Sequence, residues 1–121
     1  MNHVMLYIED DDNNISLVKA LLRRRPQIEL LVAMNGRDGI QAAIDKQPAL
    51  ILLDNRLPDA TGSEILKELA AAPATAAIPV VILSSESDDV IAQLVAHGAA
   101  EAVPKPFDIH EFIAMLDRYL T

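Results

Sequence analysis

The sequence predicts an α/β protein built on a doubly wound, five-stranded parallel sheet. Two observations carry this prediction. Five short, continuous apolar runs recur along the chain, and an amphipathic segment with helical spacing follows each of them. Continuous apolar runs are typical of strands that are buried on both faces of a parallel sheet. Strands that alternate with helices in this order favour parallel strands joined by crossover helices.

The expected strands are the apolar runs themselves, at residues 4–8, 30–33, 50–53, 80–83 and 102–103. Each expected helix has apolar residues three or four positions apart, which places them on one face. Taken in chain order, these faces are formed by Ile15, Val18 and Leu22; Ile40, Ala43 and Ile44; Ile65, Leu66 and Leu69; Ile91, Leu94 and Val95; and Ile109, Phe112, Ile113, Leu116 and Leu120.

Residues that favour helix ends support these boundaries. A proline follows three of the helical segments, at Pro26, Pro48 and Pro73, and Gly98 follows the fourth, where a left-handed C-terminal cap is expected. Asp108, with an acid three residues later, predicts the N-terminal cap of the last helix.

Length and composition limit the class of protein. The 121 residues fit one domain, 1–121, and the chain is 51% hydrophobic but only 3% aromatic, so the expected core is aliphatic. Cysteine is absent, which excludes disulfides and thiolate metal sites. No signal peptide or membrane-length apolar run is found, so we expect a cytoplasmic protein without membrane contact. The net charge of −8 disfavours direct nucleic-acid binding.

Polar side chains follow four of the five expected strands. Glu9 and Asp10 come after the first strand, Asp54 after the third, Ser84 after the fourth and Lys105 shortly after the fifth. The carboxyl ends of parallel strands meet at one edge of the sheet, where such proteins bind ligands. We therefore expect these five side chains to form one site.

The chemistry of this set favours phosphoryl transfer. Crowded carboxylates repel one another, and a magnesium ion, which prefers oxygen ligands, relieves that repulsion. Asp54 follows an unbroken apolar run, so it is expected to be rigidly placed and to serve as a carboxylate nucleophile. Lys105 and Ser84 would then contact the phosphoryl oxygens.

Each of these residues, taken singly, also has an ordinary interpretation as a turn, surface or capping residue. Asp11 and Asp12 are expected to act as helix-start acids rather than metal ligands, with Asp12 or Asn13 as the N-cap. The prediction of a site therefore rests on the joint placement of the set.

These motifs resemble the response-regulator receiver family over essentially the whole chain. The matching stretches are Leu-Tyr-Ile-Glu-Asp at 6–10, Ile-Leu-Leu-Asp-Asn-Arg-Leu-Pro at 51–58 with Gly62 after it, Val-Ile-Leu-Ser-Ser at 81–85 and Val-Pro-Lys-Pro-Phe at 103–107. The resemblance implies a flavodoxin-like receiver fold with strand order 2-1-3-4-5.

The resemblance also implies roles for the candidate residues. Asp54 would be the phosphoacceptor, taking the group from a phosphohistidine of a sensor histidine kinase or a histidine phosphotransfer protein and signalling to a downstream protein. Ser84 and Lys105 would contact the phosphoryl group, and the bond between Lys105 and Pro106 is expected to be cis. Such a protein assists its own phosphorylation and dephosphorylation and is not a conventional enzyme.

For the metal, the resemblance implies a magnesium ion bound directly by Asp10, by Asp54 and by the backbone carbonyl of Arg56, with Glu9 acting through water. The side chains of Arg56 and Glu86 would flank the entrance to the phosphoryl group.

Three positions depart from the usual family pattern. Ser84 stands where threonine is frequent, and Glu9 stands where an aspartate is frequent; in both cases the functional group is retained. Ala102 stands where an aromatic residue usually moves inward on phosphorylation, so the usual output switch is not expected here.

Three alternative functions fit the sequence less well. A pseudo-receiver that only binds proteins would not require the self-repelling acids. An aspartate-nucleophile phosphatase would carry a general acid two residues after the nucleophile, where this chain has Arg56. A flavin-binding domain would have a phosphate-binding loop after the first strand, where this chain has four acids.

Overall fold

A computed structural model describes residues 3–85, 87–105 and 107–120 of the chain. Its elements, in order, are β1 (His3–Ile8), α1 (Asp12–Leu21), the short 3-10 helix η1 (Leu22–Arg24), β2 (Ile28–Ala33), α2 (Gly36–Lys46), β3 (Leu50–Asp54), α3 (Gly62–Ala71), β4 (Val80–Ser84), α4 (Asp88–Ala96), β5 (Glu101–Pro104) and α5 (Ile109–Tyr119).

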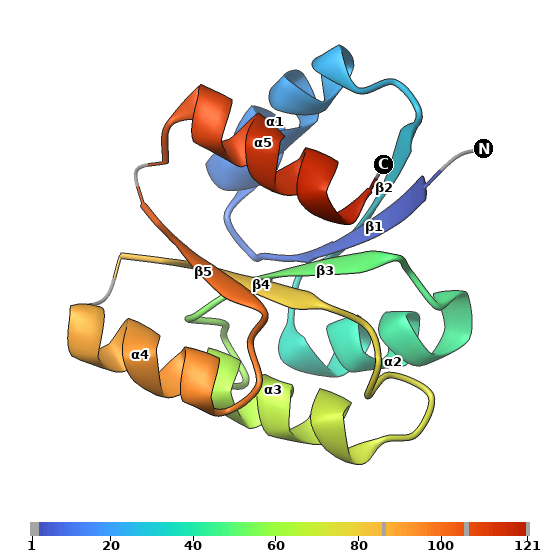
Figure 1. The fold of residues 1–121 in the computed structure, drawn as a ribbon. Coiled ribbons are helices and arrows are strands. Elements are labelled where there is room, and N and C mark those ends of the chain that lie inside the picture. Colours follow the sequence, from blue (N-terminus) through green and yellow to red (C-terminus); the bar gives the residue numbers. More distant parts are fainter. Residues whose placement is uncertain (1–2, 86, 106, 121) are drawn as a thin grey trace.

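The strands form one sheet in the order β2-β1-β3-β4-β5, and every neighbouring pair is parallel. Helices α1 and α5 cover one face of this sheet, and α2, α3 and α4 cover the other (Figure 1). The predicted doubly wound parallel sheet and its strand order are therefore confirmed.

Alternation along each strand explains the continuous apolar runs. In β1, Met5 and Tyr7 belong to the core layer beneath α1 and α5, whereas Leu6 and Ile8 belong to the layer beneath α2, α3 and α4. All four side chains have an exposed fraction of 0%. Because both faces are covered, both sets of alternate positions carry largely apolar side chains.

Strand β2 begins two residues earlier than the apolar run predicted. Ile28 is buried and lies opposite His3 in the parallel register, but Glu29 next to it is exposed. β2 is an edge strand, and its partly exposed positions accept a charge. The predicted start at residue 30 was wrong because Glu29 interrupts the apolar run.

Capping side chains fix the helix starts. Asp11, with extended backbone angles, is the N-cap of α1, so the expectation of Asp12 or Asn13 was wrong. Thr61 and Glu64 form a reciprocal capping box at α3. The predicted cap at Asp108 is confirmed, since its side chain accepts a hydrogen bond from the backbone N–H of Glu111 at 3.1 Å.

The end of α4 also follows the sequence. Gly98, just past the helix, has φ +117°, a region that side-chain-bearing residues rarely adopt. Across the described residues, no helix combines the length and apolar character that a membrane crossing requires.

Candidate functional site

The carboxyl ends of β1, β3, β4 and β5 bring the predicted site residues to one edge of the sheet. Asp54 and Ser84 are the last residues of β3 and β4, and Glu9 and Lys105 directly follow β1 and β5. The ends are level because the strands are in register, with Asp54 opposite Leu83. The backbone N–H of Lys105 also donates to the carbonyl oxygen of Ser84 at 2.8 Å.

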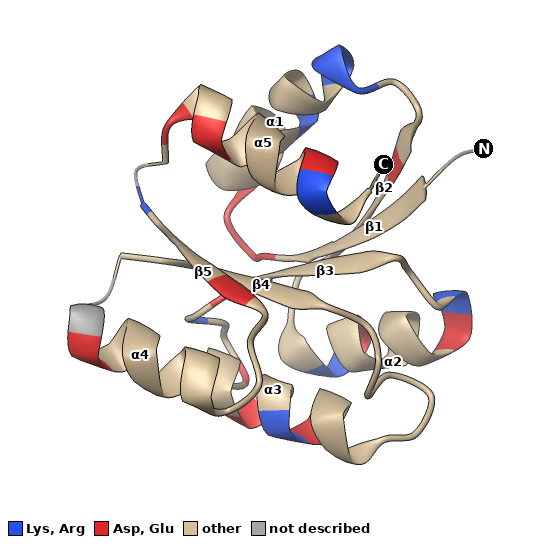
Figure 2. Ribbon diagram, in the orientation of Figure 1, with Lys and Arg blue, Asp and Glu red and all other residues tan. Residues whose placement is uncertain are grey.

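Three carboxylates gather at this edge. Glu9, Asp10 and Asp54 each place one oxygen so that the three oxygens lie within 4.8 Å of one another. Glu9 is 1% exposed and Asp54 9%, whereas Asp10 lies on the solvent side. The loop from β1 to α1 is accordingly the acidic region beside the sheet edge (Figure 2). We call these three residues the acidic cluster; their mutual repulsion favours a bound cation.

Glu9 is the most buried member of the acidic cluster. Asn14, on the first turn of α1, donates from Nδ2 to Oε1 of Glu9 at 2.6 Å. Oε2 is buried and has no hydrogen-bond partner among the described residues. Burial raises the pKa of Glu9 to about 7; the hydrogen bond from Asn14 opposes this rise, and the charge of Asp54 adds to it.

Lys105 supplies the positive charge of the site. Its Nζ lies 2.7 Å from Oδ1 of Asp54, and both side chains are largely shielded, with exposed fractions of 21% and 12%. A lysine held against the predicted nucleophile is also placed to contact a phosphoryl group bonded to that nucleophile. Ser84, at 1% exposure, completes the edge beside it.

Asp11 and Asp12 are not part of the acidic cluster. The Asp11 side chain accepts hydrogen bonds from the backbone N–H groups of Asn13 at 2.8 Å and Asn14 at 3.4 Å. The contribution of Asn14 to holding Glu9 was not predicted from the sequence. Its only signal was an amide side chain close after the acids on the first helix.

The loop after β3 carries Arg56, two residues beyond Asp54. Arg56 forms an isolated antiparallel bridge with Thr61, and the backbone N–H of Gly62 donates to the carbonyl of Asn55 at 2.9 Å. The loop therefore folds back on itself before α3. The role of the Arg56 carbonyl as a metal ligand stays a prediction. The expectations for Glu86 and for the bond to Pro106 lie outside the described residues.

Asp59 ties this loop to α2. Its Oδ1 accepts from the backbone N–H of Gly36 at 2.7 Å, and its Oδ2 accepts from that of Arg37 at 3.0 Å. These two hydrogen bonds lower the pKa of Asp59. The N-terminus of α2 is thus capped by a residue 23 positions further along the chain.

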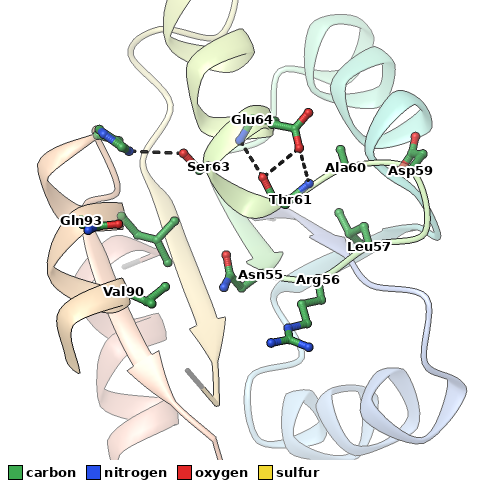
Figure 3. Close-up of a pocket in the computed structure, with 12 residues that line it drawn as sticks. Asn55, Arg56, Leu57, Asp59, Ala60, Thr61, Ser63, Glu64, Val90 and Gln93 are labelled. Atoms are coloured by element: carbon green, nitrogen blue, oxygen red, sulfur yellow. Dashed lines mark hydrogen bonds between the residues drawn. The ribbon is translucent and has the colours of Figure 1, made fainter. Parts of the chain in front are cut away.

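A groove of about 750 Å³ lies beside the acidic cluster, between the β3–α3 loop, α3 and α4 (Figure 3). Asn55, Thr61, Val90 and Gln93 are among its lining residues, and no member of the acidic cluster lines it. Across this groove, Oγ of Ser63 on α3 lies 3.3 Å from a ring nitrogen of His97, the C-cap residue of α4.

The strand order and the acids at the carboxyl edge define a doubly wound α/β domain with an acidic site at its switch point. The family model of the response regulator receiver domain matches residues 5–117. The chain therefore belongs to the response regulator receiver family, whose members are receiver domains of two-component systems.

Curated relatives agree with this assignment. The chain is 32% identical over 117 residues to the DNA-binding transcriptional regulator NtrC of Proteus hauseri, which covers 96% of this chain and 24% of that protein. It is 31% identical over 114 residues to the response regulator ArlR of Staphylococcus saprophyticus, covering 93% and 50%. The chain thus spans about a quarter of the length of the first of these relatives and half of the second.

Solved structures share the fold. The receiver domain of a sensor histidine kinase from Pseudomonas aeruginosa, determined with a magnesium ion in its active-site cleft, has a TM-score of 0.88 at 22% identity, over 98% of both chains. The phosphorylated cyanobacterial phytochrome response regulator RcpA has a TM-score of 0.85 at 24% identity, over 100% of this chain and 96% of that one.

Proposed function

We propose that this receiver domain is a phosphoacceptor, which takes a phosphoryl group onto Asp54 from a phosphohistidine of a sensor histidine kinase or a histidine phosphotransfer protein. The main support for this proposal is the 2.7 Å hydrogen bond from Nζ of Lys105 to Oδ1 of Asp54. Two further acids, Glu9 and Asp10, lie beside the same carboxylate. An aspartate without a chemical role would not require a lysine and two further acids around its carboxylate.

In the proposed step, a carboxylate oxygen of Asp54 attacks phosphorus, and the bond between phosphorus and the imidazole nitrogen of the donor breaks. An aspartyl phosphate forms, and the donor histidine leaves as neutral imidazole after taking up a proton from solvent. Lys105 places its ammonium where negative charge spreads over the phosphoryl oxygens, and Ser84 contributes a hydroxyl donor. The domain acts on itself, so we class it as a signalling protein rather than a conventional enzyme.

The acidic cluster fits a magnesium ion. Asp10, Asp54 and the Arg56 carbonyl would hold the ion directly, and Glu9 would act through water. The buried Oε2 of Glu9, without a partner among the described residues, supports this assignment because such an oxygen requires a donor or a cation. When bound, the ion neutralises charge on the carboxylates and on the phosphoryl oxygens.

The signalling step is proposed to start at Ser84. Ala102, half-buried on β5 and opposite Ile82, offers no aromatic ring to move on phosphorylation. The change is therefore carried by Ser84 and the segment that follows it into α4, towards a downstream protein. The cytoplasmic location expected from the sequence stays a prediction.

The proposal is tested by intact-mass measurement after treatment with acetyl phosphate. The mass should rise by one phosphoryl group in the presence of magnesium, and the rise should be lost with a chelator and in Asp54→Asn. An unchanged mass in the wild-type protein with magnesium would instead favour the pseudo-receiver, which keeps the fold and binds partners without phosphorylation.

A further inference from the structure

Tyr7 is a buried polar residue that the proposed function does not use. It is the second-to-last residue of β1, its exposed fraction is 0%, and it belongs to the core layer beneath α1 and α5. Its hydroxyl has no hydrogen-bond partner among the described residues. A phenylalanine would fill the same space without burying a polar group, so the hydroxyl requires an explanation.

The second buried side-chain atom without a partner is Oε2 of Glu9, and in the described part of the chain these two atoms are the whole set. Glu9 directly follows β1, two residues after Tyr7, and its backbone N–H continues the ladder to β2 by donating to the carbonyl of Ala33 at 2.9 Å. In such extended backbone, side chains two residues apart leave the same face. One group is a donor and the other an acceptor, because a phenol keeps its proton at neutral pH and a carboxylate accepts.

The charge on Glu9 also acts on the hydroxyl of Tyr7. The charges of Glu9, Asp54 and Asp11 add to burial in raising the pKa of Tyr7. Direct contact is not made, since neither atom has a partner within hydrogen-bond distance. One water can join two oxygens up to roughly 5.5 Å apart through two ordinary hydrogen bonds. Buried waters typically occur between otherwise unsatisfied polar groups.

We propose that Tyr7 is a positioning residue of the magnesium site, whose hydroxyl donates through one ordered water to the buried Oε2 of Glu9. Asn14 holds the other oxygen, Oε1, so the carboxylate is fixed from both sides. This inference rests on the proposed function, because it assigns Tyr7 to the same magnesium site. Residues that hydrogen-bond to metal-binding carboxylates orient those carboxylates, and removing such a residue typically weakens metal binding.

The aromatic composition of the chain allows the absorption of Tyr7 to be followed selectively. Tryptophan is absent, and Tyr7 and Tyr119 are the two tyrosines. Tyr119 lies on α5, and its hydroxyl donates to Glu101 at 3.0 Å, so Tyr119→Phe is the matched control. Magnesium is titrated into the wild type, Tyr7→Phe and Tyr119→Phe, with binding followed by calorimetry and by near-ultraviolet tyrosine difference absorption.

We expect a saturable tyrosine signal in the wild type and in Tyr119→Phe, and none in Tyr7→Phe. Magnesium affinity should fall on the order of tenfold in Tyr7→Phe and stay unchanged in Tyr119→Phe. In a Glu9→Gln background, Tyr7→Phe should cost much less affinity, because the coupled partner is already changed.

Equal magnesium affinity in wild type and Tyr7→Phe would overturn the role of Tyr7 and leave the proposed function intact. A tyrosine signal that disappears only in Tyr119→Phe would overturn it as well. A wild-type protein that binds no magnesium would overturn both proposals. If Tyr7→Phe does not fold, the wild-type signal decides: its persistence in Tyr119→Phe supports the proposal, and its absence from the wild type overturns it.

Discussion

Nζ of Lys105 lies 2.7 Å from Oδ1 of Asp54, although the two residues are 51 positions apart in the chain. The contact joins the ends of β3 and β5, which are not neighbours in the sheet, across the end of β4. The strand register therefore places a cation on a specific carboxylate, which is the relationship that the proposed phosphoryl transfer to Asp54 requires.

Replacing Lys105 should impair phosphorylation more than folding. In Lys105→Met, labelling of Asp54 by acetyl phosphate should slow on the order of a hundredfold, because one charged donor to the phosphoryl oxygens is lost. Rates are measured by intact mass over time at saturating magnesium. Lys67→Met, on an exposed position of α3, is the matched control and should label at the wild-type rate. Equal rates in the two variants would contradict the role of Lys105.

Asn14 should contribute to magnesium binding through Glu9. In Asn14→Ala, Oε1 of Glu9 loses the donor at 2.6 Å, so the carboxylate is less well oriented. We expect magnesium affinity to fall roughly tenfold, as for other partners of metal-binding groups. Calorimetric titration measures it, with Asn13→Ala on the exposed neighbouring position as control. A similar loss in both variants would point to a general effect on the start of α1.

Gly39 should not tolerate a side chain. A Cβ at this position of α2 would lie 2.5 Å from Cδ1 of Ile8 and 2.8 Å from its Cγ1. Gly39→Ala should lower the free energy of unfolding by about 1–3 kcal/mol, as overpacking of a core does. Urea unfolding measures the change. Ile8→Val removes Cδ1, the atom closest to the added Cβ. The double variant Ile8→Val, Gly39→Ala should therefore lose less stability than the sum of the two single changes. Losses that simply add would contradict this contact.

The cap that Asp59 provides to α2 should make stability depend on pH. The N–H groups of Gly36 and Arg37 lower the pKa of Asp59, so the folded state favours its ionised form. The contribution of Asp59 to the free energy of unfolding is therefore complete above the pKa of an aspartate in the unfolded chain, about 3.9. This contribution is lost as the pH falls through the lower pKa that Asp59 has in the folded state.

Asp59→Ala should accordingly lower Tm near neutral pH, and the difference from wild type should shrink in acid. Asp45→Ala, at an exposed position of α2, is the control and should differ little from wild type throughout. A difference in Tm for Asp59→Ala that stays constant as the pH falls would contradict the charged cap.

Several features of the fold were predictable because they follow from local pattern. The run at 50–53 predicted β3 since every side chain in it is buried, and the strand ends then predicted that Asp54 and Lys105 would share one edge. The start of β2 was not predictable from the same rule. Its Glu29 is exposed at the edge of the sheet, and a linear sequence does not state which strand is at an edge.

Long-range polar contacts were the least predictable part. Three consecutive aspartates, Asp10 to Asp12, stand at the start of α1, and aspartate is a favoured N-cap residue. In the structure the cap is Asp11, whose side chain accepts from the backbone N–H groups of Asn13 and Asn14. The hydrogen bond from the Gly36 N–H to Asp59 and the hydrogen bond from Asn14 to Glu9 depend on how loops and a helix meet. Residue types alone predict that such groups need partners, but not which partners they find.

The central claim is tested most directly by locating the phosphoryl group itself. The protein is treated with acetyl phosphate and magnesium, reduced with borohydride, which converts an aspartyl phosphate to homoserine, and mapped by peptide mass spectrometry. Phosphorylation at Asp54 predicts homoserine at position 54 alone, and none in Asp54→Asn. An unmodified Asp54, or a stable phosphoserine at Ser84, Ser85 or Ser87, would contradict it.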